Sequence, residues 1–329
     1  MPIRPNPICL LTNPSVNESK FILMRHLKTL FNEGHHKAIL SKDVNKIYSI
    51  RFNNSYVDTE ITPNAVEEMK RANELTNVNV EKIYVSPMKR TLLTCLESIK
   101  LLEKSNKQKE PPIVEINPFL FEKIEDSSDL NNNLNTKKEN FSTFVFRNKK
   151  YPINWDKMTS VFNNNDYLYY QLRFCDQILD DKLANNKIAK YDIENELKNN
   201  IITNNFYNYV LSKAKNMSDE DLSEEINNNI IPNVIHEMKR LAEYDNDAFI
   251  ESFDSVSYRL KQVTKDIQKC YPNPQNNIDN KVLIIGHSVL FQYWCTQSIK
   301  KDSFDPHIDR ERLYNCELVG VNFNYNCLL

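Results

Sequence analysis

The stretch Phe21-Ile-Leu-Met-Arg-His-Leu-Lys-Thr-Leu-Phe-Asn32 decides the fold class of this chain. Its apolar run, Phe21 to Met24, is typical of a strand buried on both faces, as in a parallel sheet between two layers of helices. In such sheets ligands bind beyond the carboxyl ends of the strands. Because Arg25 and His26 follow at that end, the sequence predicts a phosphate or carboxylate site there.

Two other strands are predicted to end in the same way. Lys281-Val-Leu-Ile-Ile-Gly-His287-Ser288 is a second apolar run that ends in a histidine. Ile83-Tyr-Val85 leads into Ser86-Pro87, which we predict to be the N-cap and first residue of a helix that carries Arg90 near its start. The positive N-terminal end of that helix would then face an anion at the ends of the strands.

These motifs, in this order, resemble those of the histidine phosphatase superfamily, also called the phosphoglycerate mutase-like family, in the branch whose acid is a glutamate rather than a His-Asp pair. The resemblance covers the first third and the last quarter of the chain. The matching stretches are Arg25-His-Leu-Lys-Thr-Leu-Phe-Asn32, Asp58-Thr-Glu-Ile-Thr-Pro-Asn-Ala65, Ser86-Pro-Met-Lys-Arg-Thr-Leu-Leu-Thr94, Pro118-Phe-Leu-Phe-Glu122, Glu251-Ser252 with Arg259, and Gly286-His-Ser288.

The resemblance implies a phosphatase that works through a phosphohistidine, without a metal or another cofactor. It assigns the nucleophile to His26 and the acid to Glu122, with Glu125 and Asp126 as alternatives for the acid. The remaining residues that it implies for catalysis or substrate binding are Arg25, Arg90, His287, Asn32 and Ser288.

The same residues suit phosphate chemistry on physical grounds. A phosphomonoester carries about two negative charges near neutral pH, and an arginine pairs with phosphate oxygens through two parallel hydrogen bonds. A neutral imidazole is a nucleophile that needs no prior deprotonation. Because Arg25 and Arg90 oppose protonation of His26, we expect its lone pair to stay available.

Departures from the family pattern leave alternatives open. Leu27 replaces a glycine, so its side chain either narrows the pocket or turns away, and Lys28 replaces an acid and adds positive charge. A phosphomutase is less favoured, because no arginine pair follows Glu122. The other alternative is a catalytically weak or inactive protein that binds phosphorylated ligands or partners.

Composition agrees with an α/β chain of about two domains, since 40% of its 329 residues are hydrophobic. We predict an N-terminal extension at 1–18, a phosphoglycerate mutase-like core at 19–125 and 248–329 with a mostly parallel sheet and helices on both faces, and a mainly helical insertion at 126–247. We also expect a loop with a short helix at 34–56 and a flexible polar loop at 127–138.

The charge and the cysteine content limit which partners and which cellular compartment are expected. The net charge of -2, with 26% charged residues of both signs, makes nucleic acid a poor candidate partner. The 7 cysteines are scattered singly, which suits free thiols in a reducing cytoplasm. We expect neither secretion nor a membrane span, because Ile8 to Leu11 is too short for the core of a signal peptide and no apolar run has the length of a span. The expected partner is a phosphorylated small molecule or a phosphoprotein, and the oligomeric state is left open.

Overall fold

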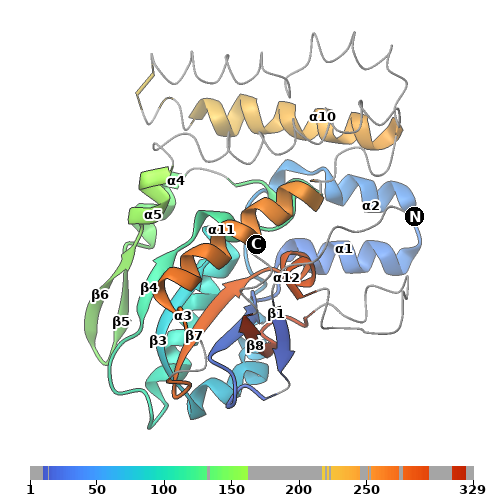
Figure 1. The fold of residues 1–329 in the computed structure, drawn as a ribbon. Helices are drawn as coiled ribbons and strands as arrows, with labels where there is room; N and C mark the ends of the chain where they lie inside the picture. Colours follow the sequence, from blue (N-terminus) through green and yellow to red (C-terminus); the bar gives the residue numbers. More distant parts are fainter. Residues whose placement is uncertain are drawn as a thin grey trace.

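The computed structural model describes residues 10–13, 15–131, 134–161, 217–218, 221, 224–244, 251, 253–273, 277–295 and 313–323. Its centre is an 8-stranded sheet with the strand order β1-β8-β2-β7-β3-β4-β6-β5 (Figure 1). The strands are Leu10–Asn13 (β1), Phe21–Arg25 (β2), Asn79–Val85 (β3), Ile113–Ile116 (β4), Thr143–Phe146 (β5), Lys149–Asn154 (β6), Asn280–Gly286 (β7) and Leu318–Phe323 (β8).

The central part of the sheet is parallel. Strands β2, β7, β3, β4 and β6 pair in parallel along the order of the sheet. Antiparallel pairs are confined to its two sides, where β8 lies between β1 and β2 and where β5 lies beside β6. The predicted α/β class with a mixed, mostly parallel sheet is therefore confirmed.

Helices cover both faces of this sheet. The helical segments are Leu30–Ser41 (α1), Val44–Arg51 (α2), Asn54–Tyr56 (η1), Ala65–Asn77 (η2), Lys89–Glu103 (α3), Pro118–Leu120 (η3), Ser127–Asp129 (η4), Leu134–Asn140 (α4), Asp156–Val161 (α5), Ile226–Ile230 (η5), Ile231–Tyr244 (α10), Phe253–Cys270 (α11) and Ser288–Cys295 (α12). The segments marked η have a 3-10 or, for η5, a π geometry.

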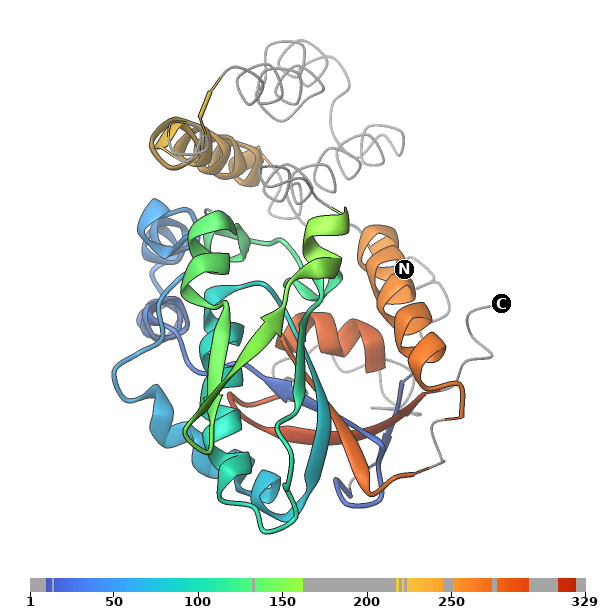
Figure 2. The same cartoon turned by 90° about the vertical axis from the view of Figure 1, so that its left-hand side faces the viewer.

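Alternation along β2 divides its side chains between two buried clusters, because successive residues of a strand point to opposite faces. Phe21 and Leu23 join the cluster that holds buried residues of α11 and α12. Ile22 and Met24 join the cluster that holds buried residues of η2 and α3. Figure 2 shows α11 on one side of the sheet and η2 with α3 on the other. This double burial explains why Phe21 to Met24 is uniformly apolar.

The strand register brings the predicted site residues to one edge. Arg25, at the end of β2, lies opposite Gly286, at the end of β7. The amide of His26 donates to the Gly286 carbonyl at 3.1 Å, and the amide of Ser86 donates to the Ile285 carbonyl at 3.1 Å. Three segments that are far apart in sequence therefore end next to one another.

Two predicted segments contribute strands that the sequence analysis did not anticipate. Strand β1 lies within the predicted N-terminal extension and pairs with β8. Strands β5 and β6 lie within the predicted helical insertion, and β6 pairs with β4 of the sheet. The strands form because Phe144, Phe146 and Ile153 are buried in the same cluster as η2 and α3. The division into core and insertion itself stays a prediction, and residues 162–216 lie outside the described residues.

Three local predictions were wrong. The segment 34–56 is mostly helical, in α1 and α2, with Thr29 and Asp43 as N-caps. In the segment 127–138, residues Ser127 to Asp129 form η4 and are buried, and residues 134–138 belong to the start of α4. Helix α3 begins at Lys89 rather than at Pro87, with Met88 as its N-cap, because Ser86 still continues the edge of β3 through its bond to Ile285.

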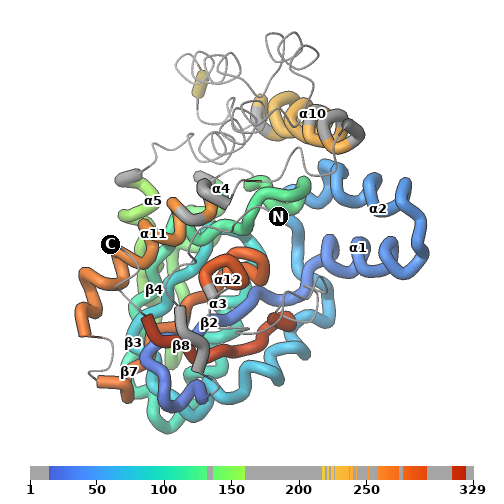
Figure 3. The backbone as a smooth tube through the Cα atoms, turned by 45° about the vertical axis from the view of Figure 1, so that its right-hand side comes forward, coloured from blue at the N-terminus to red at the C-terminus, as the bar shows by residue number. Residues whose placement is uncertain are grey.

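Helix α10 lies above α2 in Figure 3. The hydroxyl of Tyr48, on α2, donates to the Ala242 carbonyl of α10 at 3.3 Å, which joins the two helices. Within the described parts of the chain, no helix has the length and apolar character needed to span a membrane.

Candidate functional site

His26 is held in one tautomer at the carboxyl end of β2. Its Nδ1 lies 2.6 Å from the Leu27 carbonyl oxygen. Because a carbonyl oxygen only accepts hydrogen bonds, Nδ1 must carry a proton, and in the neutral ring Nε2 then keeps its lone pair. Burial holds the pKa of His26 well below its ordinary value, and the charges of Arg90 and Arg25 lower it further. The ring is therefore neutral near pH 7.

His287 lies beside His26, with 5.2 Å between the ring centroids. The Nε of Arg90 donates to His287 Nδ1 at 3.3 Å, so the proton of the neutral ring sits on Nε2. That nitrogen lies 2.9 Å from Ser86 Oγ and donates to it. Burial lowers the pKa of His287 well below its ordinary value, and Arg90 lowers it further. Both imidazoles are thus buried, neutral and oriented.

The two predicted arginines approach this pair from different elements. Arg90 is buried in the first turn of α3, where its NH1 donates to the Ser128 carbonyl at 2.6 Å and its NH2 lies 3.3 Å from Asp129 Oδ1. Arg25 is half-buried, and its NH1 donates to the Leu313 carbonyl at 2.7 Å. Both guanidinium groups act on the pKa of His26, so positive charge gathers around the two rings.

Glu122 is the buried acid of the cluster. Its carboxylate accepts from the Leu290 amide at 2.9 Å and from the Val289 amide at 3.4 Å, in the first turn of the helix that begins directly after His287. Burial raises the pKa of Glu122, whereas Arg90 and the bonded amides oppose that rise. A carboxyl group that keeps its proton to a higher pH than usual suits a proton donor.

The two alternative acids have other partners. Glu125 Oε1 accepts from Lys123 Nζ at 2.6 Å, and the Glu125 side chain is 29% exposed. Asp126 Oδ1 accepts from the amide of Ser128 at 2.9 Å and from its hydroxyl at 2.7 Å, which caps η4. Burial raises the pKa of Asp126 to about 6. The geometry thus favours Glu122, whose carboxylate borders the helix that follows His287.

The structure answers the question that Leu27 raised. Its side chain is fully buried in the cluster with η2 and α3, so it turns into the core. Its amide donates to Thr94 Oγ1 at 2.8 Å, which fixes the backbone directly after His26. A leucine therefore fits where the family pattern has glycine, because its side chain packs into this core cluster.

The predicted substrate contacts Asn32 and Ser288 lie in helix starts. Asn32 forms a capping box with Thr29 at the start of α1, in which its Oδ1 accepts from the Thr29 amide at 3.2 Å. Ser288 is buried at the start of α12. The side chain of Asn32 is thus engaged in capping α1, whereas Ser288 lies next to His287.

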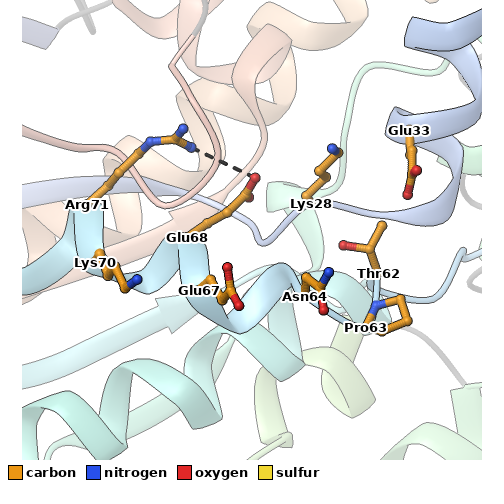
Figure 4. A pocket seen from close by; sticks show the side chains of 9 residues that line it. All are labelled: Lys28, Glu33, Thr62, Pro63, Asn64, Glu67, Glu68, Lys70 and Arg71. Atoms are coloured by element: carbon orange, nitrogen blue, oxygen red, sulfur yellow. Dashed lines mark ion pairs between the residues drawn. The ribbon is translucent and has the colours of Figure 1, made fainter.

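Lys28 borders a separate cavity of about 530 Å³. Figure 4 shows its side chains, which come from the segment after His26 and from η2 with the residues before it. The lining residues are Lys28, Glu33, Thr62, Pro63, Asn64, Glu67, Glu68, Lys70 and Arg71. The lining holds as many acidic as basic side chains, and Arg71 lies 3.9 Å from Glu68, so the charge of Lys28 does not make this cavity basic overall.

The comparisons with known proteins find similarity in structure but not in sequence. The sequence matches no protein-family model and no curated protein. The structure is similar to the crystal structure of phosphoglycerate mutase from Bacillus anthracis str. Sterne, at 14% sequence identity and a TM-score of 0.39, over 94% of this chain and 95% of that chain. The function considered next therefore rests on the site residues and their contacts.

Two residues of the cluster were missed as site residues. Ser86 was predicted only as a helix cap, yet its Oγ accepts a hydrogen bond from His287 Nε2. Asp129 lies in the segment predicted as a flexible loop, yet it is buried against Arg90. The capping pattern Asp126-Ser-Ser-Asp129 was the signal that could have predicted an ordered turn there.

If the site hydrolyses phosphomonoesters, as the sequence motifs predict, we expect Ser86→Ala to lower kcat for that reaction on the order of 10-fold. The reason is that His287 loses the partner that sets its tautomer and orientation. Ser86→Thr keeps the hydroxyl and is expected to restore most of the activity. Since Ser86 also accepts weakly from the Met88 amide at 3.4 Å, thermal unfolding separates this effect from a loss of stability. A lowered melting temperature with unchanged kcat and pH profile would assign Ser86 to structure alone.

Proposed function

We propose that this protein hydrolyses phosphomonoesters through a phosphohistidine on His26. One observation carries the proposal: the Leu27 carbonyl holds the proton of His26 on Nδ1, which leaves the lone pair of Nε2 free within a cluster that also contains His287 and Arg90. A neutral nucleophile beside positive charge is what attack on a phosphate dianion requires.

In this proposal the arginines bind the phosphate group and stabilise its negative charge. Arg90 and Arg25 would hold the phosphate oxygens and neutralise them, with His287 beside them. Their charges already act on both imidazoles, which places positive potential where the transition state gathers negative charge.

The reaction then has two steps, transfer of the phosphoryl group to His26 and hydrolysis of the phosphohistidine. The lone pair of His26 Nε2 attacks phosphorus, the bond to the ester oxygen breaks, and that oxygen takes the proton of Glu122. In the second step the Glu122 carboxylate takes a proton from water, the oxygen of that water attacks phosphorus, and the N–P bond breaks to release inorganic phosphate and free His26. Splitting the reaction in this way replaces one difficult displacement by two easier ones.

The substrate class follows from the residues that the site offers. We include phosphorylated small molecules and phosphoproteins, because the cluster recognises the phosphate group itself. A phosphomutase is less favoured, since no pair of arginines comes directly after Glu122 in the sequence to hold a second phosphate.

Trapping the intermediate tests this function directly. The protein is mixed with an aryl phosphate, denatured in alkali, in which phosphohistidine survives, and digested for mass spectrometry. We expect a phosphate on the peptide that contains His26. Turnover of the aryl phosphate without any phosphorylated His26 would rule out this mechanism.

Glu122→Gln is expected to lower kcat on the order of 100-fold for an alkyl phosphate and much less for an aryl phosphate with a stable phenolate leaving group, because only the poor leaving group needs the proton. Burial raises the pKa of Glu122, so the wild-type rate should fall as pH rises through that pKa. This decrease in rate at high pH, called here the alkaline fall, should be absent in Glu122→Gln.

Glu125→Gln is the matched control for the alternative acid, because it removes the same charge three positions further along. We expect it to keep both the rate and the pH profile. If Glu125→Gln instead loses the alkaline fall and Glu122→Gln keeps it, the acid is Glu125.

A binding protein for phosphorylated ligands is the second candidate, and one observation favours it. His26 and Arg90 are each 3% exposed, so little of either side chain reaches solvent. A closed site of this kind suits binding without turnover. No release of phosphate from a broad panel of phosphoesters, together with binding of inorganic phosphate that is lost in Arg90→Ala, would support this candidate over the phosphatase.

A further inference from the structure

A carboxylate already occupies the arginine that the proposed function gives to phosphate. Asp129 Oδ1 lies 3.3 Å from Arg90 NH2, and the two side chains are 7% and 3% exposed. The Ser128 carbonyl accepts from Arg90 NH1 at 2.6 Å, so η4 contacts the guanidinium group at both terminal nitrogens. A phosphate that uses this fork must replace at least one of these contacts.

Asp129 is presented to Arg90 by a turn that is itself well anchored. Its Oδ2 accepts from the amides of Glu125 at 3.1 Å and Asp126 at 3.3 Å. The hydroxyl of Ser127 donates to the Asn53 carbonyl at 2.9 Å, and the Leu130 carbonyl accepts from the Asp58 amide at 3.1 Å. Because the backbone is tied on both sides of Asp129, release of Arg90 requires one of the two side chains to rotate, and rotation of Asp129 also breaks its Oδ2 bonds to the Glu125 and Asp126 amides.

The surroundings of Asp129 disfavour additional negative charge. Burial raises the pKa of Asp129 well above its ordinary value, and the charges of Asp126 and Glu122 raise it further, whereas Arg90 opposes them. A phosphate dianion that arrives at Arg90 would add a stronger repulsion than these carboxylates do. The charged carboxylate of Asp129 and a phosphate dianion therefore exclude each other at this guanidinium group, so phosphate binds there only when Asp129 has moved away or taken up a proton.

We infer that Asp129 weakens the binding of phosphate groups to the site by competing with them for Arg90; the inference rests on the proposed function. When only a fraction of the molecules has Arg90 free, the apparent affinity of every anion falls by that fraction. The loss is the same factor for a phosphomonoester and for inorganic phosphate, but an ester that makes contacts beyond its phosphate group has affinity to spare. Inorganic phosphate has no such contacts, so the product is held weakly after the ester bond breaks.

The test is calorimetric titration of the full-length protein with inorganic phosphate. Asp129→Asn keeps the size and an oxygen acceptor but removes the charge, and we expect it to bind inorganic phosphate about 10-fold more tightly than the wild type. Glu125→Gln removes the same charge from the same segment, but Glu125 contacts Lys123 rather than Arg90. We expect its affinity for phosphate to stay within about 2-fold of the wild type.

Two further variants keep the result interpretable. Arg90→Ala combined with Asp129→Asn should abolish the gain in affinity, because the gain requires the guanidinium group. Asp129→Ser serves if thermal unfolding shows that Asp129→Asn does not fold, since the shorter side chain also frees Arg90. Phosphate binding by the folded Asp129 variant that is equal to or weaker than that of the wild type overturns the inference.

Turnover of an aryl phosphate in the same preparations separates this inference from the proposed function. If Asp129→Asn binds phosphate more tightly but no turnover depends on His26, the competition at Arg90 is supported and the phosphatase is refuted. If turnover depends on His26 but Asp129→Asn binds phosphate with unchanged affinity, the phosphatase is supported and the competition at Arg90 is refuted. If neither the wild type nor the folded Asp129 variant binds phosphate or turns over the ester, both are wrong.

Discussion

His26→Ala is expected to reduce the hydrolysis of an aryl phosphate on the order of 1,000-fold or more, because the variant lacks the atom that forms the bond to phosphorus. The effect should appear in kcat, since Arg25 and Arg90 remain to bind the phosphate group. Steady-state release of inorganic phosphate measures it, and the phosphorylated peptide should be absent.

Two companion variants sharpen this prediction. His26→Asn keeps a side-chain donor for the Leu27 carbonyl, and should be equally inactive if the role of His26 is nucleophilic rather than structural. His36→Ala changes an exposed histidine of α1, and should leave the rate unchanged. Equal turnover by His26→Ala and the wild type would exclude the mechanism.

Glu251→Ala is expected to lower the free energy of unfolding by about 3–5 kcal/mol, because it leaves the Arg259 charge buried without its carboxylate. Both side chains are 0% exposed. The Nε of Arg259 donates to Glu251 Oε1 at 2.8 Å, and its NH2 donates to Oε2 at 2.7 Å. Urea denaturation followed by circular dichroism measures the loss.

The pair also supports the site. Arg259 NH1 donates to the carbonyls of Phe119 at 2.9 Å and Phe121 at 2.8 Å, directly before Glu122. We therefore expect Glu251→Ala to lose more activity than its folded fraction explains.

A surface pair provides the control. Glu97→Ala removes a carboxylate from an exposed pair with Lys100, whose side chains are 20% and 63% exposed. Such pairs contribute about 0.5 kcal/mol or less. A loss of stability in Glu251→Ala no larger than that in Glu97→Ala would show that the buried pair is dispensable.

Features of the fold with a local signature were predictable from the sequence. The buried strands β2 and β7 appear as apolar runs, because double burial removes polar residues from both faces. His26 and His287 follow these runs directly, so the fold class already implied that they meet at one edge of the sheet. Arg90 was predictable in the same way, as a residue near the start of the helix after β3.

Features that depend on distant partners were not predictable. Ser86 and His287 are 201 positions apart, and Arg90 and Asp129 are 39 apart. Asp129 lies in a polar run whose composition indicates a loop, because nothing in the run itself reveals the guanidinium group that it meets. Strands β5 and β6 were missed for a similar reason, since their pairing with β4 is a long-range choice.

The sequence by itself thus determined the layered α/β class and the kinds of side chain that gather at the ends of its strands, because periodicity and local chemistry are written along the chain. Only the tertiary structure decided which way Leu27 points, which tautomers the two histidines hold and which carboxylate occupies Arg90. The tautomer of His26 depends on the carbonyl of the adjacent Leu27, whose orientation the fold sets. The other features depend on atoms that long-range packing brings together, and no short stretch of sequence contains both partners.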